Sequence, residues 1–135
     1  MIVPHKIRLV GPWEFQVADD PPQRVTMPVS WRELFGHRAQ TVLFTRAFQW
    51  PGELPDGGSL HVVFTGVHGR GFVWLNDQPL NSFAASPETY SECEFDLSSA
   101  VQRSNRLKIE LSFDPDQSDA PGGLYGPVVL EVREE

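Results

Sequence analysis

Alternation of apolar and polar residues, rather than helical periodicity, dominates this chain. In the segment 105–113, "NRLKIELSF", every second residue from Leu107 to Phe113 is apolar, and charged or polar residues fill most of the positions between them. Successive side chains of a β-strand point to opposite faces, so this pattern predicts a strand with one buried face. No segment keeps the i, i+3, i+4, i+7 apolar spacing of a long amphipathic helix. The chain is therefore predicted to be mostly β.

Short segments of this kind recur along the chain and end at Gly, Pro, Asn or Asp. A spacing of about 8 to 12 residues between such strands is typical of a sandwich or barrel. The pattern predicts an all-β, antiparallel sandwich with strands near residues 6–10, 13–17, 24–27, 41–50, 59–66, 70–76, 90–97, 105–113 and 127–133.

Helix is expected only as one or two single turns between strands. The clearest is "VSWRELFG", where Ser30 and Glu33 have the spacing of a capping box. Val29 and Leu34 are placed as a hydrophobic staple, and Gly36 supplies the stop. This segment is predicted to be one capped helical turn.

Length and charge narrow the class of protein. The 135 residues, 40% of them apolar, suit one domain spanning 1–135 with one core. A formal net charge of −7 excludes nucleic acid as an expected partner, because that affinity comes from clustered Lys and Arg. No run approaches the roughly 20 apolar residues of a membrane span, and the first residues do not read as a signal peptide. Localisation stays open, with the cytoplasm as the default.

The residue types of common catalytic and metal centres do not gather in any recognisable motif. There is no G-x-S-x-G, no glycine-rich phosphate loop and no pair of histidines at metal spacing, so no catalytic residue, cofactor or metal is predicted. The single cysteine, Cys93, alternates in phase with Phe95 and Leu97 and is interpreted as a small buried side chain.

Several moderately specific segments occur in an order that resembles a known family. They are "VGPWEF", "MPVSW", "FTRAFQWP", "LHVVFTGVHGRGFVWLND", "CEFDLSSAVQRSNRLKIEL" and "GGLYGPVVLEV". Together they cover nearly the whole chain and resemble the N-terminal sugar-binding domain of glycoside hydrolase family 2. The resemblance implies a jelly roll of the galactose-binding-like type.

The resemblance also implies what the chain does not do. In that family the two catalytic glutamates lie on a separate barrel domain, which 135 residues of this pattern do not supply. We therefore expect a non-catalytic carbohydrate-binding or accessory module, whose partners are a carbohydrate, bound weakly, and a catalytic barrel domain or another protein. The alternative is a β-sandwich that binds a partner protein and no sugar. An exposed aromatic platform would favour sugar, and an exposed apolar patch of several hundred Å² would favour protein.

The segment "GFVWLNDQPL" raises the question of platform or scaffold directly. Asn76 and Asp77 suit a tight hairpin, because both residue types tolerate a positive φ. The resemblance implies that this strand is scaffold, which favours packing for Trp74. A ligand platform that includes Trp74 is the open alternative.

The loop from residue 114 to 126 is the main candidate recognition site. In the family, an aspartate and an arginine near a Gly-Ile-x-Arg segment reach the sugar; here those positions hold Gln117 and Gly126. Asp116 and Asp119 could replace the aspartate if the loop shifts register, and Tyr125 could stack on a pyranose with its hydroxyl directed outward. Glycines in the loop would let the backbone approach a ligand.

The same loop carries a weaker metal hypothesis. Asp114, Asp116 and Asp119 offer three hard oxygen ligands within six residues, whereas calcium takes about six to eight. A solvated acidic loop is the alternative interpretation, and it is preferred.

Arg46 is the last candidate. It alternates in phase with Phe44 and Phe48, where the family also has an arginine between aromatics. A guanidinium on an apolar face needs a partner, so we expect an ion pair with an acid on a neighbouring strand, for which Asp96 is the candidate. A sugar-binding arginine is the alternative.

Overall fold

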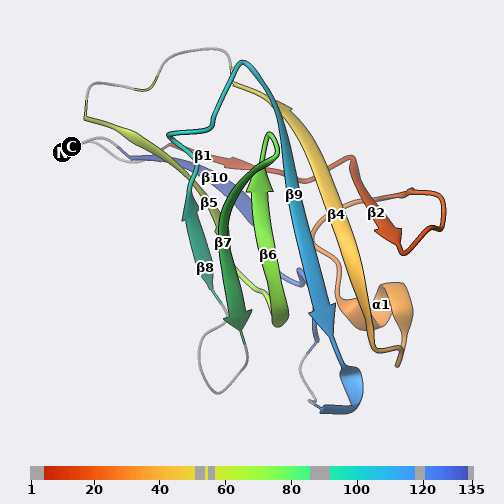
Figure 1. Cartoon of the computed structure of the whole chain (residues 1–135). Coiled ribbons are helices and arrows are strands. Elements are labelled where there is room, and N and C mark those ends of the chain that lie inside the picture. The colour runs from red at the N-terminus through yellow and green to blue at the C-terminus, as the bar shows by residue number, and fades with distance from the viewer. Residues whose placement is uncertain (1–4, 51–53, 55–56, 86–91, 118–120, 134–135) are drawn as a thin grey trace.

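Two antiparallel β-sheets face each other in the computed structural model (Figure 1), which describes residues 5–50, 54, 57–85, 92–117 and 121–133. A four-stranded sheet has the order β1-β10-β5-β8, and a six-stranded sheet has the order β3-β2-β4-β9-β6-β7. The elements are β1 (His5–Arg8), β2 (Trp13–Val17), β3 (Gln23–Val25), α1 (Trp31–Phe35), β4 (Gln40–Gln49), β5 (Ser59–Phe64), β6 (Gly69–Leu75), β7 (Gln78–Ala85), β8 (Cys93–Asp96), β9 (Ser104–Phe113), η1 (Pro115–Gln117) and β10 (Val128–Arg133).

The predicted all-β antiparallel sandwich is confirmed. Each of the nine predicted strands is present, with ends that shift by a few residues, and a tenth, β7, was not predicted. The two helical elements, α1 and η1, are single turns, as expected. Within the described ranges, neither of them has the length or apolar character of a membrane-spanning segment.

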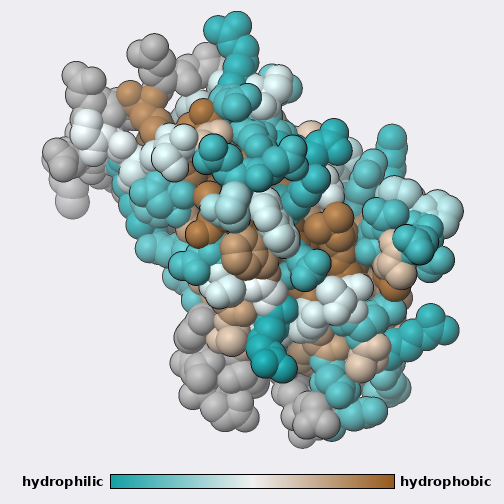
Figure 2. Space-filling view, in the orientation of Figure 1, coloured by the Kyte–Doolittle hydropathy of each residue, from teal (hydrophilic) through white to brown (hydrophobic). Residues whose placement is uncertain are grey.

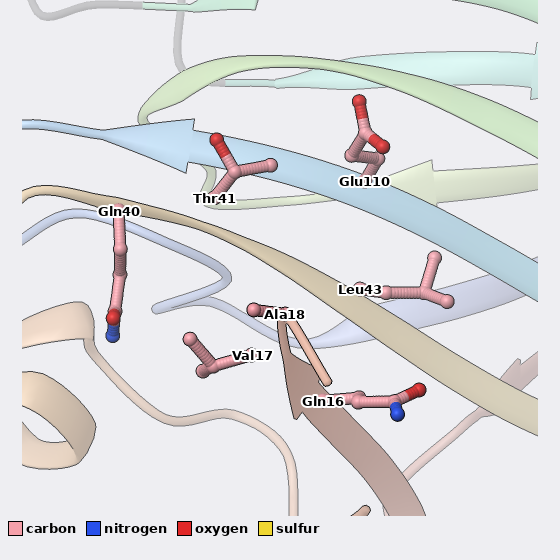
Figure 3. A pocket seen from close by; sticks show the side chains of 7 residues that line it. All are labelled: Gln16, Val17, Ala18, Gln40, Thr41, Leu43 and Glu110. Carbon is pink, nitrogen blue, oxygen red and sulfur yellow. The ribbon is translucent and has the colours of Figure 1, made fainter. Parts of the chain in front are cut away.

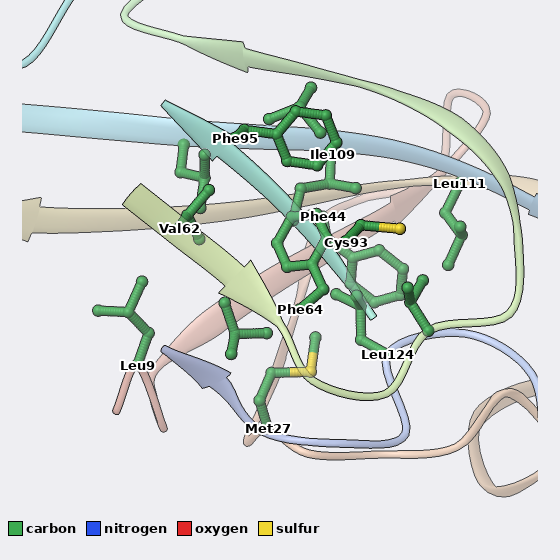
Figure 4. Close-up of a cluster of buried hydrophobic side chains, with 14 of the residues drawn as sticks. Leu9, Met27, Phe44, Val62, Phe64, Cys93, Phe95, Ile109, Leu111 and Leu124 are labelled. Atoms are coloured by element: carbon green, nitrogen blue, oxygen red, sulfur yellow. The ribbon is translucent and has the colours of Figure 1, made fainter. Parts of the chain in front are cut away.

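The core fills the space between the sheets (Figure 4). Strand β9 alternates as the sequence predicted. From Leu107 to Phe113 every second side chain is buried, and the side chains between them face outward. Phe64 on β5 packs against Phe95 on β8 at 5.6 Å between ring centroids. Burial of these aromatic and branched side chains is the main favourable term that holds the two layers together.

Cys93 belongs to this core, as expected. Its side chain is 8% exposed. Burial, helped by the nearby charge of Glu92, raises the pKa of the thiol to about 11. The thiol is therefore a neutral packing group at physiological pH.

The turn of "GFVWLNDQPL" joins β6 to β7 through two residues of positive φ, Asn76 at 53° and Asp77 at 66°. Leu75 pairs with Gln78 across it. A two-residue loop with both φ values positive is a favoured hairpin connection, because its twist matches that of the strands. The prediction of a tight hairpin at this point is confirmed.

Asn76 also holds the hairpin to the rest of the sheet. Its Nδ2 donates to Ala100 O at 3.0 Å and to Asn105 Oδ1 at 2.9 Å, and its Oδ1 accepts from the Arg106 N–H at 2.9 Å. These contacts occupy the amide with other parts of the protein. Asn76 is therefore part of the scaffold.

The helical turn α1 has the predicted cap. Ser30 is the N-cap, and its hydroxyl accepts from the Glu33 N–H at 3.2 Å. Gly36 ends the turn with φ 61°. Trp31 is buried, and its Nε1 donates to Arg38 O at 2.8 Å. The turn thus closes the sandwich at the end where β9 finishes (Figure 1).

Candidate functional site

The described parts of the 114–126 loop lie at the end of the sandwich that α1 closes (Figure 1). Arg32 Nη2 on α1 donates to Pro115 O at 3.2 Å, which ties η1 to the helical turn. The Trp31 N–H donates to Gly122 O at 3.0 Å. The loop is thus attached to α1 on both sides of residues 118–120.

The loop glycines serve contacts within the protein. A Cβ on Gly122, which has φ 77°, would lie 2.3 Å from Phe113 Cε2. A Cβ on Gly126 would lie 2.6 Å from Gly66 N. Side chains are excluded at these two positions because neighbouring protein atoms occupy the space. The expectation that the loop glycines let the backbone approach a ligand stays a prediction.

Tyr125 packs against His68. The two rings are 4.7 Å apart between centroids with a 42° tilt, and Tyr125 Oη lies 3.3 Å from His68 Nε2. His68 itself is 5% exposed, and its backbone exchanges hydrogen bonds with Gly123 at 3.0 and 3.1 Å. The hydroxyl is thus directed at His68 rather than outward as expected, while the ring remains partly exposed.

The acidic part of the loop is only partly described. Asp116 is exposed, and its N–H donates to Asp114 Oδ1 at 3.0 Å. The backbone of Gln117 ends η1, and Asp119 lies outside the described residues. Within the described ranges no group of three or more His, Cys, Asp or Glu could hold a metal ion. The calcium hypothesis, which needs Asp119, stays a prediction.

Arg46 does not pair with Asp96, and that expectation is wrong. Its Nη2 donates to Gly11 O at 3.3 Å and its Nη1 to Ala47 O. Asp96 alternates with buried Phe95 and faces outward on the four-stranded sheet, where it accepts from the Ser98 N–H at 2.8 Å. Arg46 faces the interior from the other sheet, so the two side chains point into different spaces.

The guanidinium of Arg46 is bound by carbonyls rather than by a carboxylate. Its Nε is buried and has no hydrogen-bond partner among the described residues. Burial lowers the pKa of Arg46 from its ordinary value, with no carboxylate to oppose that effect in the described part of the chain. The sugar-binding alternative for this residue stays a prediction.

Arg46 is also remote from the loop. On β4, Arg46 pairs with Leu107 and Gln40 pairs with Phe113, the last residue of β9 before the loop. A rise of about 3.3 Å per residue places these two levels of the strand about 20 Å apart. The structure therefore brings Asp116, Gln117 and Tyr125 to one end of the sandwich and leaves Arg46 along its length.

A hollow on the outer face of the six-stranded sheet was not predicted (Figure 3). It has a volume of about 470 Å³ and is lined chiefly by Gln16, Gln40, Thr41, Leu43 and Glu110. Its residues come from three strands, β2, β4 and β9, and the turn after β2. Thr41, Leu43 and Glu110 read as ordinary outward strand positions, whereas Gln40 shares the parity of the buried Val42 and Phe44. Only the register between the strands could therefore have revealed the site.

Comparison with known proteins identifies the fold. The sequence matches no protein-family model and no curated protein. Among solved structures, a β-glucuronidase of Ruminococcus gnavus is similar over 98% of this chain with TM-score 0.81 and 15% identity. An FMN-binding β-glucuronidase of Facaelibacterium prausnitzii is similar over 96% with TM-score 0.78 and 22% identity. A putative β-galactosidase of Bacteroides fragilis is similar over 98% with TM-score 0.79 and 18% identity.

The chain corresponds to a part of each of these proteins. It spans 28%, 22% and 24% of their lengths, in the same order. The likeness extends over nearly the whole chain, as the resemblance predicted. The chain therefore has the β-sandwich fold of a domain found in these β-glucuronidases and in the putative β-galactosidase.

Proposed function

We propose that this chain is a non-catalytic carbohydrate-binding or accessory module related to the sugar-binding domain of glycoside hydrolase family 2. One observation carries the proposal: the likeness covers 96 to 98% of this chain and 22 to 28% of the glycosidases. The whole chain thus corresponds to one module of enzymes that act on sugars. A catalytic barrel, or another protein that carries one, is the partner that such a module would accompany.

One pair of neighbouring carboxylates, on β8, lacks the features of a catalytic pair. Glycoside hydrolysis by the usual route needs a pair of carboxyl groups about 5 to 9.5 Å apart, one of them held protonated as general acid. Glu94 and Asp96 share the outer face of β8, but hydrogen bonds from Arg133 and Ser98 respectively hold the pKa of each below its ordinary value. Neither carboxyl is kept protonated, and the strand face is no cleft.

The exposed surface favours sugar over a partner protein. Among the described residues the exposed large hydrophobic side chains are Ile7 at 48% and Val10 at 44%. Two such side chains at the edge of one sheet do not make the contiguous patch of several hundred Å² that typically marks a protein interface. An aromatic pair on the six-stranded sheet, Phe72 and Trp74, is the kind of platform that favours a saccharide.

Titration of the ¹⁵N-labelled chain with galactose, mannose, glucuronic acid and their short oligosaccharides tests the loop as the binding site. We expect a Kd near 1 mM, equivalent to about 4 kcal/mol, with shifts on the described part of residues 114–126. Tyr125→Ala should abolish these shifts if the ring stacks on sugar, whereas Tyr125→Phe, which keeps the ring and removes the hydroxyl, should retain them. Equal binding by both variants would remove the loop as the site.

An activity assay tests the non-catalytic part of the proposal. We expect no turnover of chromogenic β-galactosides, β-glucuronides or β-mannosides. Turnover that survives repurification and disappears when Glu94 or Asp96 is replaced by its amide would contradict it.

A further inference from the structure

One row of outward side chains crosses the six-stranded sheet. Gln16 on β2 lies opposite Leu43 on β4, Leu43 lies opposite Glu110 on β9, and Glu110 lies opposite Phe72 on β6. Along each strand, the residues that precede and follow these four are mostly buried. The four side chains therefore share the outer face. Neighbouring strands are about 4.8 Å apart, which makes the row about 14 Å long.

The β2 end of the row opens into the hollow of about 470 Å³ (Figure 3). Gln16 Nε2 donates to Asp20 O at 3.0 Å, and its amide oxygen has no partner in the described part of the chain. The Gln40 amide makes no side-chain hydrogen bond within the same residues. Thr41 Oγ1 and Ser112 Oγ are 2.6 Å apart, so one hydroxyl donates to the other and the accepting hydroxyl keeps a hydrogen free to donate. The hollow thus offers donors and acceptors together.

The walls of the hollow are apolar. Val17, Ala18 and Leu43 surround these polar groups. Ala18 has φ 49°, in the left-handed region that favours glycine, at the turn where β2 leaves the sheet. Apolar walls with a few convergent amides and hydroxyls are typical of a small-molecule site and suit a ligand that has both C–H faces and hydroxyls.

The β6 end of the row carries an aromatic pair. The rings of Phe72 and Trp74 are 4.7 Å apart between centroids, tilted by 43°, and both side chains are partly exposed. The Trp74 indole N–H makes no hydrogen bond within the described residues. Figure 2 shows hydrophobic surface within a largely hydrophilic face, over β4 and near β6 and β7. Aromatic faces pack on the C–H side of a sugar ring, and a free indole N–H can donate to a hydroxyl.

The charge between the two ends selects the ligand further. Glu110 is exposed and forms no ion pair among the described residues. Its carboxylate can accept two sugar hydroxyls, but it repels an acidic ligand at the same distance. The net charge of −7 acts in the same direction. Two cations share the face: Arg70 lies opposite Ser112, and Lys108, opposite Trp74, pairs with Asp77 at 3.3 Å. Glu110 holds the centre of the row, so a neutral saccharide fits this face better than an acidic one.

We propose that the outer face of the six-stranded sheet binds a short neutral oligosaccharide. One sugar stacks on the Phe72 and Trp74 pair, the next donates hydroxyls to Glu110, and a third enters the hollow beside Gln40 and Thr41. The proposal rests on the proposed function for the class of ligand, and it uses no residue of the 114–126 loop.

Titration of the ¹⁵N-labelled chain with cellotriose, maltotriose and mannotriose tests this. At least one trisaccharide should shift amides of residues 40–43, 70–74 and 108–112, and trigalacturonic acid should bind at least 10-fold more weakly. Glu110→Gln, an exposed and isosteric change, should weaken binding by 3- to 10-fold, and Phe72→Ala should weaken it further. Tyr125→Ala should leave this binding unchanged.

The outcomes separate this surface from the loop. Shifts confined to residues 121–126 would overturn the outer-face site while supporting the proposed function. The outer-face site would also be overturned if its residues shift but neither Glu110→Gln nor Phe72→Ala changes the Kd. The dispersion of the amide spectrum of each variant shows whether that variant is folded. If Phe72→Ala does not fold, Glu110→Gln alone decides.

Discussion

Replacement of Asn105 should reveal how much stability a buried amide contributes to this sandwich. The side chain is 5% exposed at the start of β9. Its Oδ1 accepts from Gln102 N at 2.7 Å and from Asn76 Nδ2 at 2.9 Å, and its Nδ2 donates to Gln102 O at 2.7 Å. A longer contact of 3.5 Å reaches Phe48 O. One amide thus joins β9 to the β6–β7 hairpin and to β4.

The geometry sets the size of the expected effect. Each of the three short bonds contributes about 1 kcal/mol net, and removal of the amide breaks the bonds to the Gln102 backbone and to the Asn76 side chain together. Asn105→Ala should therefore lower the free energy of unfolding by about 3 kcal/mol, a large part of the roughly 5 to 15 kcal/mol that holds an ordinary domain folded. Asn105→Asp keeps the volume but turns a donor toward Gln102 O into an acceptor, so its loss should be at least as large.

Urea denaturation followed by tryptophan fluorescence measures these differences. Asn81→Ala is the matched control, because Asn81 is exposed on β7 and its side chain accepts, within the described residues, a single hydrogen bond, from the Ser82 N–H at 2.8 Å. It should change stability by no more than about 0.5 kcal/mol. A loss below about 1 kcal/mol for Asn105→Ala, or a milder effect for Asn105→Asp, would refute the assignment of this stability to the hydrogen bonds.

Three further substitutions or modifications follow from the structure. Arg46→Leu should cost about 1 to 2 kcal/mol in urea denaturation, since carbonyls rather than a carboxylate hold Arg46; a loss above about 3 kcal/mol would indicate a charged partner. Cys93, with a thiol pKa of about 11 against an ordinary 9.0, should react with iodoacetamide at pH 8 roughly 100-fold more slowly in the folded chain than in urea, and equal rates would contradict its burial. Arg133 holds the pKa of Glu94 below its ordinary 4.5, so the stabilisation is present above that pH and is lost as pH falls through the lowered pKa. The stability difference between wild type and Glu94→Gln should therefore shrink from pH 7 to pH 3, and a constant difference would argue against the pair.

The strands that were predicted are those whose own sequence carries the signal. In β9 every second side chain is apolar over the whole strand, so parity alone identifies its buried face. The cap and stop of α1 are local as well, since Ser30, Glu33 and Gly36 act within one turn. Strand β7 carries a weak signal, because only Phe83 and Ala85 are buried in "QPLNSFAA". It exists through its pairing with β6, which its own residues do not reveal.

The sites were harder to predict because they depend on which strands are neighbours. The parity of Arg46 correctly predicted an inward side chain between Phe44 and Phe48. The choice of Asp96 failed because parity does not say to which sheet a strand belongs. Tyr125 was correctly placed at the end of a loop, but its hydroxyl partner, His68, is 57 residues away in sequence. No pattern within either segment points to the other.

The outer-face row depends most strongly on which strands are neighbours, because its residues come from four strands. Its position also depends on the backbone contact between β6 and β9. A Cβ on Gly71 would lie 1.8 Å from Glu110 O, so only glycine allows β6 to lie this close to β9. That approach sets Phe72 opposite Glu110 and Trp74 opposite Lys108. A shift of one residue would turn Phe72 and Trp74 into the core and expose Val73 and Leu75 instead. The aromatic pair therefore lies on the outer face because the buried residues of β6 and the close approach at Gly71 fix the register of the strand.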